Sequence, residues 1–328
     1  MIIPAKLKEG DGVRVVAPAK SMALPFITGE LKETAKKRFK ELGLVLSFGK
    51  HVNEKNSFES SSVESRVEDL HDAFKDPSIK MILAVIGGFN SIEVLPALDY
   101  TLIRKNPKIV LGYSDITALS NGIYARTGLV SYSGPSFFDF GEKKNFEYSL
   151  DHFKKCLFER APYKIHSSKQ WSNDRWANDQ EHRTYVPNEG MYALNEGEAK
   201  GTIVGGNLVT FHALSGTPYM PSLRNSILFF EDDHDEDVLT INRALSSISL
   251  NPEFEYVQGV VFGRFQPESK FGEPELRSII KNNPLLQEIP IIAGADFGHT
   301  SPRITFPVGG TARFSGSKNK VELEILKH

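Results

Sequence analysis

Residues 108–122 read KIVLGYSDITALSNG, and this stretch sets the pattern for the N-terminal half of the chain. Its apolar run stops at Gly112 and Tyr113, and a helix start follows at Asp115. Ser114 stands at the junction, where two interpretations are open. It is either an ordinary N-cap of the helix, or a nucleophile held on a sharp strand-to-helix turn, with the next amide pointing to where an oxyanion would form.

The same alternation of apolar strands and amphipathic helices extends along the first half of the chain. Residues 12–19 form an apolar run, and residues 27–43 follow with apolar side chains at helical spacing, ending in a glycine that suits a helix C′ position. A second helix is expected after Ser61 or Ser62, either of which can cap it. Continuous apolar strands separated by helices predict a parallel sheet covered on both faces.

Between about Pro162 and Gly190 this rhythm breaks. The segment is polar, has no sustained period and carries both tryptophans, so we interpret it as a linker or a functional loop. Later apolar runs and amphipathic segments predict a second domain of mixed α and β structure. The expected division is an N-terminal α/β domain (1–165), a linker or insertion loop (166–190) and a C-terminal mixed α/β domain (191–328).

The composition narrows the class of protein. A length of 328 residues suggests two domains that can each bury a core. With 39 Lys and Arg against 41 Asp and Glu, the chain lacks the basic excess that gripping phosphate backbones demands, so no nucleic-acid partner is expected. No stretch approaches the ~20 apolar residues of a membrane span, so no membrane contact is expected. The single cysteine, Cys156, fits a reducing compartment, and we expect a cytoplasmic protein.

Open parallel sheets collect their chemistry at the carboxyl ends of the strands, and three strand ends carry suitable residues. Ser114 is the first. Gly87 and Gly88 follow the run MILAVI and either form a tight turn or let the backbone approach a ligand, with a free amide as a second oxyanion donor. Glu231 ends the run SILFF, where its carboxylate can accept the Nδ1 proton of a histidine and hold the tautomer that a general base needs.

His299 is the candidate base among nine histidines. It lies in a loop after the apolar run IPIIAGADFG and can reach a cleft, although a structural role is the alternative. His71, His152 and His212 fall in expected helices, where structural roles are favoured. The acidic run EDDHDED, residues 231–237, also allows a metal interpretation, but a contiguous run of acids is more typical of a solvated loop.

Six motifs, taken in one order, carry a resemblance to a known family. They are VIGGFNS, GYSDITAL, GTIVGGNLVTFHALSGTPYMP, ILFFEDD, GVVFGRF and GADFGHTSPRITFPVGG. Together they resemble the LD-carboxypeptidase family of serine peptidases, which includes the microcin C immunity proteins. The resemblance spans nearly the whole chain, from Ile3 to about Leu326.

The resemblance implies an α/β fold with an N-terminal flavodoxin-like (Rossmann-like) parallel-sheet domain and a C-terminal mixed β/α swivelling domain. It also implies a Ser-Glu-His triad, in which Ser114 is the nucleophile, Glu231 orients the base and His299 is that base. The family's oxyanion donors map to the backbone amides of Gly88 and Asp115. The resemblance implies a cytoplasmic homodimer that needs no cofactor and no metal.

The family has two branches that differ in substrate. One removes a terminal D-amino acid from murein tetrapeptides during cell-wall recycling, and the other cleaves the amide that joins an aminoacyl group to a nucleotide in microcin C and related compounds. Residues 171–190 resemble the longer insertion of the second branch, which we favour, with the murein activity as the alternative. Trp176, with Trp171 in reserve, is expected to stack on a nucleobase. Packing of both rings against a domain is the other interpretation.

Gly87 and Arg303 complete the expected substrate-binding residues. Arg303 lies four residues after His299 and is a candidate for binding a substrate carboxylate or phosphate, with a plain surface position as the alternative. Two rival functions from other classes are a non-catalytic two-domain ligand-binding protein and a metal-dependent hydrolase that uses residues 231–237. A serine-directed reagent separates the first rival from a serine peptidase, and a chelator separates the second.

Overall fold

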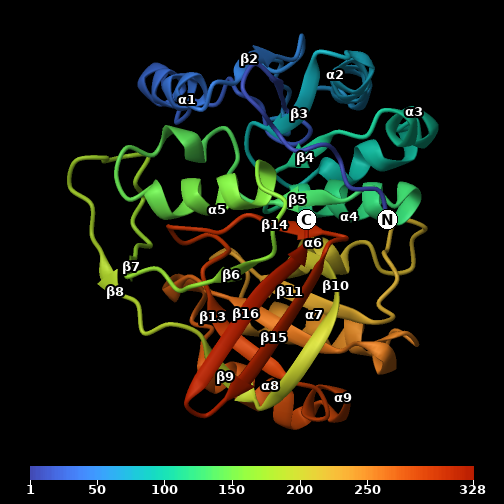
Figure 1. Ribbon diagram of the computed structural model, residues 1–328, viewed down its shortest axis with the longest axis vertical. Coiled ribbons are helices and arrows are strands. Elements are labelled where there is room, and N and C mark those ends of the chain that lie inside the picture. The colour runs from blue at the N-terminus through green and yellow to red at the C-terminus, as the bar shows by residue number, and fades with distance from the viewer.

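The computed structural model describes all residues, 1–328, as two sheets with their helices, one above the other along the long axis (Figure 1). The upper sheet has the strand order β14-β5-β4-β3-β1-β2. Strands β1 to β5 run parallel, and β14 runs antiparallel to β5. Its strands are β1 (Gly12–Val16), β2 (Val45–Phe48), β3 (Ile79–Ala84), β4 (Ile109–Leu111), β5 (Ser131–Ser133) and β14 (Phe306–Val308).

Helices cover both faces of this sheet, which confirms the predicted doubly covered parallel sheet. Helices α1 and α5 share one core cluster with the strands, while α2, α3 and α4 pack in another. The predicted signals at helix ends are confirmed, since Ser62 accepts a hydrogen bond from the amide of Ser65 and Gly43 has a φ of +72°. The helices are α1 (Gly29–Glu41), α2 (Val63–Lys75), α3 (Tyr100–Lys105), α4 (Ile116–Thr127) and α5 (Glu147–Leu157).

The lower sheet is mixed, as predicted for the second half of the chain, with the order β6-β16-β15-β10-β11-β12-β13-β9. Strands β10 to β13 run parallel, and the outer strands run antiparallel to their neighbours. The strands are β6 (Tyr163–Ile165), β9 (Tyr192–Asn195), β10 (Gly197–Asn207), β11 (Ser226–Glu231), β12 (Gly259–Gly263), β13 (Ile291–Ala295), β15 (Thr311–Ser317) and β16 (Lys320–Lys327). The helices are α6 (Leu208–His212), α7 (Val238–Ser249), α8 (Glu273–Asn282) and α9 (Pro284–Gln287).

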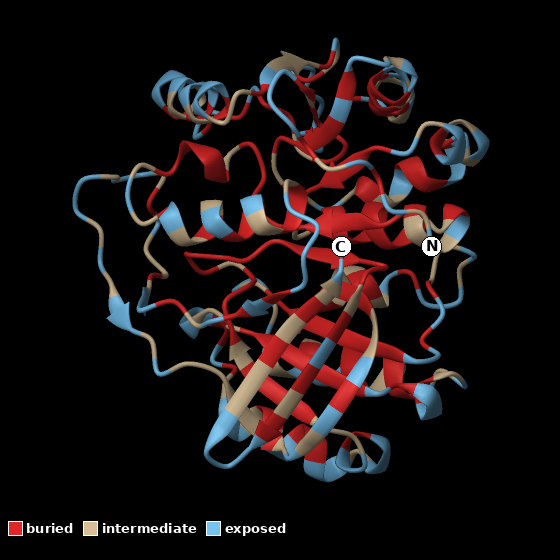
Figure 2. Ribbon diagram, viewed as in Figure 1, coloured by how far each residue is buried: buried red, intermediate tan, exposed pale blue.

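Two strands cross the boundaries expected from the sequence. Strand β6 precedes residue 166 but pairs with β16 in the lower sheet, and β14 follows residue 191 but pairs with β5 in the upper one. Figure 2 shows that buried residues run from the upper sheet to the lower one. One core cluster accordingly joins side chains from both sheets, such as Leu83 and Phe229. The two halves of the chain therefore share strands and core.

The expected insertion loop, residues 166–190, is held against the rest of the molecule by hydrogen bonds, and we call it the strap. It forms the short hairpin of β7 (Gln170–Trp171) and β8 (Val186–Pro187). Ser172 exchanges two backbone hydrogen bonds of 2.7 and 2.9 Å with Ser301, which lies two residues after His299. The side chain of Arg183 is 1 % exposed and bonds to Asp174 and Glu142, which fixes the strap to the segment after β5. The strap thus contacts the loop that carries the candidate base.

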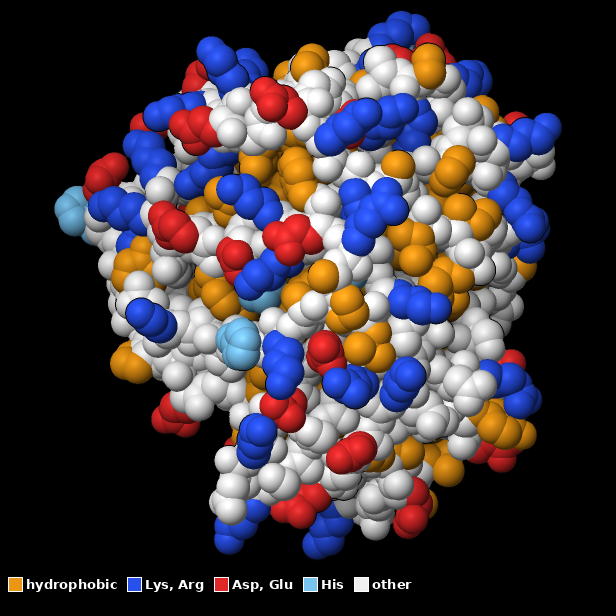
Figure 3. All heavy atoms as spheres, in the orientation of Figure 1, with side chains coloured by type: hydrophobic (Ala, Val, Ile, Leu, Met, Phe, Trp, Pro, Cys, Tyr) orange, Lys and Arg blue, Asp and Glu red, His pale blue; other side chains and the backbone are white.

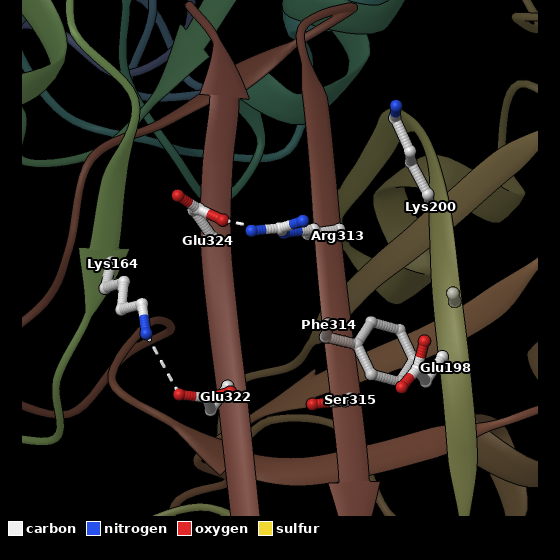
Figure 4. Close-up of a pocket in the computed structure, with 9 residues that line it drawn as sticks. Lys164, Glu198, Lys200, Arg313, Phe314, Ser315, Glu322 and Glu324 are labelled. Atoms are coloured by element: carbon white, nitrogen blue, oxygen red, sulfur yellow. Dashed lines mark hydrogen bonds and ion pairs between the residues drawn. The ribbon is translucent and has the colours of Figure 1, made fainter.

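Charges of both signs are interspersed over the face shown in Figure 3. On the open side of the lower sheet, a shallow pocket of about 570 Å³ is lined by strands β6, β16, β15 and β10. Figure 4 shows two ion pairs in this pocket, Lys164 with Glu322 at 3.0 Å and Arg313 with Glu324 at 2.7 Å. None of the helices combines the length and the apolar character that crossing a bilayer requires.

Candidate active site

Ser114 stands on the sharp turn between β4 and α4 in a left-handed backbone conformation, with a φ of +60°. A non-glycine residue in this region costs on the order of 1–3 kcal/mol, and such strain persists where the surrounding structure imposes it. The N-cap position of α4 is taken by Asp115, and Ser114 makes no side-chain capping bond to the helix. The geometry is therefore that of a strand-to-helix elbow that exposes a hydroxyl, and not that of a plain N-cap.

The structure brings Ser114, His299 and Glu231 together from two loops and the end of strand β11. The Oγ of Ser114 lies 3.0 Å from Nε2 of His299, and Nδ1 of His299 lies 2.8 Å from Oε2 of Glu231. The carboxylate of Glu231 is 3 % exposed and the imidazole of His299 is 16 % exposed. A hydroxyl, an imidazole and a buried carboxylate in this order form the arrangement that activates a serine for attack on an acyl carbon.

A glycine makes the contact between histidine and glutamate possible. Gly298 has a φ of +115°, and a Cβ atom added there would lie 2.9 Å from Oε2 of Glu231. The loop that carries His299 therefore approaches β11 more closely than any side chain at position 298 would allow.

The charge of the imidazole is set by carboxylates near both of its nitrogens. Burial alone would lower the pKa of His299, but Glu231 and Asp233 outweigh burial and raise this pKa above its ordinary value. Asp233 contributes because one of its oxygens lies 3.8 Å from Nε2. The carboxylates thus stabilise the imidazolium that forms when Ser114 gives up its proton.

Two backbone amides next to Ser114 have no acceptor within the protein. Neither the N–H of Gly88 nor that of Asp115 takes part in an intramolecular hydrogen bond. Both residues line one cavity with Ser114. The loop of Gly87 and Gly88 is held in place by the Asp115 carboxylate, which accepts hydrogen bonds of 3.0 and 2.8 Å from the amides of Asn90 and Ser91. These free donors suit the stabilisation of an oxyanion.

Gly87 lies directly against the serine. A Cβ atom added at Gly87 would come within 2.8 Å of Cβ and 2.9 Å of Oγ of Ser114, so no side chain fits there without displacing the hydroxyl. This is the close backbone approach that the sequence suggested, although the neighbour is the hydroxyl itself.

The cavity beside Ser114 has a volume of about 150 Å³ and includes residues that the sequence analysis missed. Asn207 lies at a fourth strand end, that of β10, where the run Gly-Gly-Asn was the available signal. Its side chain donates to Asp232 at 2.7 Å and accepts from Thr210 at 2.9 Å. Phe89 directly follows the glycine pair and is 74 % exposed at this cavity. No Lys, Arg or His lines the cavity, whereas Asp232, Asp233 and Glu236 do.

None of the four expected substrate-binding residues lines this cavity, although Gly87 lies against Ser114. Trp176 is 7 % exposed and packs on Phe138, with ring centroids 4.7 Å apart. Trp171 lines another pocket, of about 330 Å³, with the Arg264 guanidinium 4.9 Å from its ring. Arg303 is buried, not on the surface, and pairs with Asp139.

The acidic run after β11 is divided among several structural roles. Glu231 contacts His299, Asp232 accepts from Asn207 and from the amide of Val209, and Asp237 caps α7. Burial and the neighbouring Glu231 raise the pKa of Asp232 to about 7. No three His, Cys, Asp or Glu side chains in the structure gather as a metal-ligand set.

Comparison with known proteins places this chain in a family. The model of the LD-carboxypeptidase N-terminal domain matches residues 13–134, and that of the C-terminal domain matches residues 200–314. The chain belongs to the LD-carboxypeptidase family. Gly88 and Ser114 lie in the first of these matched regions and Glu231 and His299 in the second.

Relatives within the LD-carboxypeptidase family cover almost the whole chain. The crystal structure of an MccF-like protein from Bacillus anthracis str. Ames matches with a TM-score of 0.98, at 46 % identity over 100 % of both chains. The Microcin C7 self-immunity protein MccF of Escherichia coli is 32 % identical over 84 % of this chain and 85 % of its own length. The Murein tetrapeptide carboxypeptidase of Pseudomonas aeruginosa is 24 % identical over 94 % of each chain. This chain is therefore a peptidase of the family.

Proposed function

We propose that this peptidase uses Ser114 as the nucleophile, His299 as the general base and Glu231 as the orienting carboxylate. Its proposed reaction is hydrolysis of the amide in a microcin C-type aminoacyl-nucleotide or a related peptide. The observation that carries the proposal is the continuous set of contacts from Ser114 Oγ through His299 to Glu231. These contacts join three segments that are far apart in the sequence, and two free backbone amides lie in the same cavity as Ser114.

The reaction begins with proton transfer from Ser114 to Nε2 of His299 as Oγ attacks the acyl carbonyl carbon. The N–H groups of Gly88 and Asp115 hold the negative oxygen of the tetrahedral intermediate. His299 then donates the proton to the leaving nitrogen, and the C–N bond breaks. Water, deprotonated by His299, releases the acyl group and restores Ser114.

The charge of the cavity favours the aminoacyl substrate. Asp232, Asp233 and Glu236 line it, and no cationic side chain in the lining balances their charge. An aminoacyl group carries a free ammonium next to the scissile carbonyl, and this cation complements the acidic wall. A solved structure of MccF contains glutamyl sulfamoyl guanosine and matches this chain with a TM-score of 0.89 at 27 % identity. The alternative substrate is a murein tetrapeptide, supported by the relative from Pseudomonas aeruginosa.

Side-by-side assays of the purified protein test the proposal. One assay offers an aminoacyl sulfamoyl adenylate and the other an L,D-muropeptide, with release of the amino acid or acyl product measured. Cleavage of the first compound alone supports the proposed substrate, and cleavage of the muropeptide alone overturns it in favour of the alternative.

Replacement of the nucleophile tests the mechanism. Ser114→Ala is expected to lower kcat by at least about 10⁴-fold, because loss of a triad serine removes covalent catalysis. The matched control is Ser120→Ala in α4, since the hydroxyl of Ser120 is buried and has no hydrogen-bond partner. Labelling with a fluorophosphonate, followed by mass spectrometry, should modify the wild type and the control but not Ser114→Ala. Wild-type turnover by Ser114→Ala, or no labelling of an active wild type, excludes this mechanism. A wild type that neither reacts with the reagent nor turns over a substrate supports the ligand-binding rival instead.

Other expectations from the resemblance stay predictions. A nucleobase contact for Trp176 requires its ring to become accessible, because the ring now packs on Phe138. Light scattering of the purified protein tests the expected homodimer. Cell fractionation tests the expected cytoplasmic location.

A further inference from the structure

Arg303 holds the backbone on both sides of His299. Its Nε donates to the carbonyl of Gly298 at 3.0 Å, and its Nη2 donates to the carbonyl of Thr300 at 3.3 Å. These carbonyls belong to the residues immediately before and after His299. Arg303 is 5 % exposed, and its planar guanidinium therefore fixes the peptide unit between Gly298 and His299 and the one between Thr300 and Ser301.

The same guanidinium contacts the segment that carries Ser114. Its Cζ lies 4.5 Å from the ring centre of Tyr113, the residue before Ser114, and this ring lies 5.2 Å from that of His299. Nη1 donates to Asp139 of the N-terminal domain, which also accepts from the Tyr113 hydroxyl at 3.3 Å. Arg303 thus contacts both sides of the gap between nucleophile and base.

The geometry points to Arg303 as a positioning residue that fixes His299 against Ser114 across the two domains. This inference rests on the proposed function, because it assigns Arg303 a part in aligning that triad. It replaces the substrate-binding role expected from the sequence. Each of its three guanidinium nitrogens donates to the protein, and Arg303 is absent from the wall of the Ser114 cavity.

A lysine cannot take over these contacts. Its single ammonium is a point charge and cannot place donors on the carbonyls of Gly298 and Thr300 and on Asp139 while also covering the Tyr113 ring. Arg303→Lys keeps the charge and loses the geometry, whereas Arg303→Met loses both. Since a misplacement of about 1 Å between reacting groups costs about 100-fold in rate, we expect Arg303→Lys to lower kcat by about 100-fold with KM unchanged.

The pH profile distinguishes the two variants. The groups that face the His299 ring with charge are Glu231, Asp233 and Arg303, and the uncharged ring of Tyr113 lies beside it. Removing the positive charge in Arg303→Met favours the imidazolium, so the acid limb of kcat/KM should move to higher pH. Arg303→Lys should leave the limb in place. If the role of Arg303 were merely structural, the variants would yield less folded enzyme, but the kcat of the folded fraction and the acid limb of kcat/KM would stay unchanged.

The test measures kcat, KM and the rate of fluorophosphonate labelling for wild type and variants of the full chain, with thermal unfolding as the measure of folding. Arg14→Lys is the control, because the side chain of Arg14 bonds to Ser47 and Asp76, away from the loops that carry Ser114 and His299. If Arg303→Met does not fold, Asp139→Asn serves as the second variant. It weakens the ion pair that holds the Arg303 guanidinium and should slow labelling. An unlabelled wild type contradicts the proposed function. If the wild type is labelled and Arg303→Lys reacts equally fast, or shows only a raised KM, the inference is overturned.

Discussion

The imidazole of His299 faces a carboxylate at each of its nitrogens, and this fixes how activity should depend on pH. Glu231 lies 2.8 Å from Nδ1 and Asp233 lies 3.8 Å from Nε2. A general base accepts a proton only in its neutral form. Because the pKa of His299 is raised, the ring becomes neutral only at a higher pH than a free imidazole does. Activity should therefore be lost as pH falls through a value above the ordinary histidine pKa of about 6.5.

The Asp233→Asn variant tests the contribution of the more distant carboxylate. Its removal should lower the pKa of His299, so the acid limb of kcat/KM should move to lower pH while the triad stays intact. Asp235→Asn is the control, since this exposed carboxylate lies in the same segment and does not act on His299. Full pH–rate profiles measure the shift. An acid limb that moves equally in both variants, or in neither, contradicts this account of the imidazole charge.

Two strand ends meet at the nucleophile, and the space between them is set by a glycine. The loop after β3 brings Gly87 against the elbow after β4 so closely that an added Cβ would lie 2.8 Å from Cβ of Ser114. The carboxyl edge of a parallel sheet brings such loops together because neighbouring parallel strands end on the same side. The elbow and the amide of Gly88 therefore form one unit.

Gly87→Ala should displace the serine hydroxyl without unfolding the protein. A shift of about 1 Å at Ser114 predicts a loss of about 100-fold in kcat. Gly29→Ala is the matched control, since an added Cβ at the first position of α1 meets no atom within 4 Å. Steady-state kinetics and circular dichroism of both variants provide the measurement. Wild-type kcat in Gly87→Ala would show that the loop can move away without affecting the serine.

The strand ends are also where sequence reasoning was most informative. The apolar runs before Gly87 and Ser114 predicted a parallel sheet, and that topology alone indicates that the loops after these two strands share an edge. Glu231 ends a strand of the other sheet, so sheet topology did not predict its approach to Ser114. The positive φ of Ser114 was not predictable, because the surrounding fold imposes it on a residue that prefers other conformations. The interior position of Arg303 was equally hidden, since its partner Asp139 lies 164 residues away.

The division into domains shows where local patterns fail. Strand β14 is three residues long, Phe306–Val308, and its pairing with β5 bridges more than 170 residues of sequence. Such an edge contact leaves no periodic signal, because three apolar residues suit many surroundings. The assignment of Tyr163–Ile165 to the first domain met the same difficulty, since its partner strand lies near the end of the chain.

The two halves of the molecule are joined most directly where α4, which begins at the elbow, lies against β10. Asn121 of α4 donates to the carbonyl of Gly205 at 2.8 Å and accepts from its amide at 3.1 Å, so one buried side chain satisfies both polar groups of that residue. Next to it, the hydroxyl of Thr117 accepts from the amide of Asn207 at 2.9 Å. Since Asn207 lines the Ser114 cavity, this contact couples the stability of the interface to the shape of the site.

Asn121→Ala should therefore weaken the whole molecule and not one half of it. Leaving the buried amide and carbonyl of Gly205 unpaired costs about 1–3 kcal/mol each, which predicts a loss of about 2–6 kcal/mol in the free energy of unfolding. Asn106→Ala is the control, because the Asn106 side chain makes one partly buried bond to Leu102. Urea unfolding should follow a single transition by near-UV circular dichroism and by fluorophosphonate labelling, since strands and core are shared. Two separate transitions in the wild type, or equal stability of the two variants, would contradict this coupling of the domains.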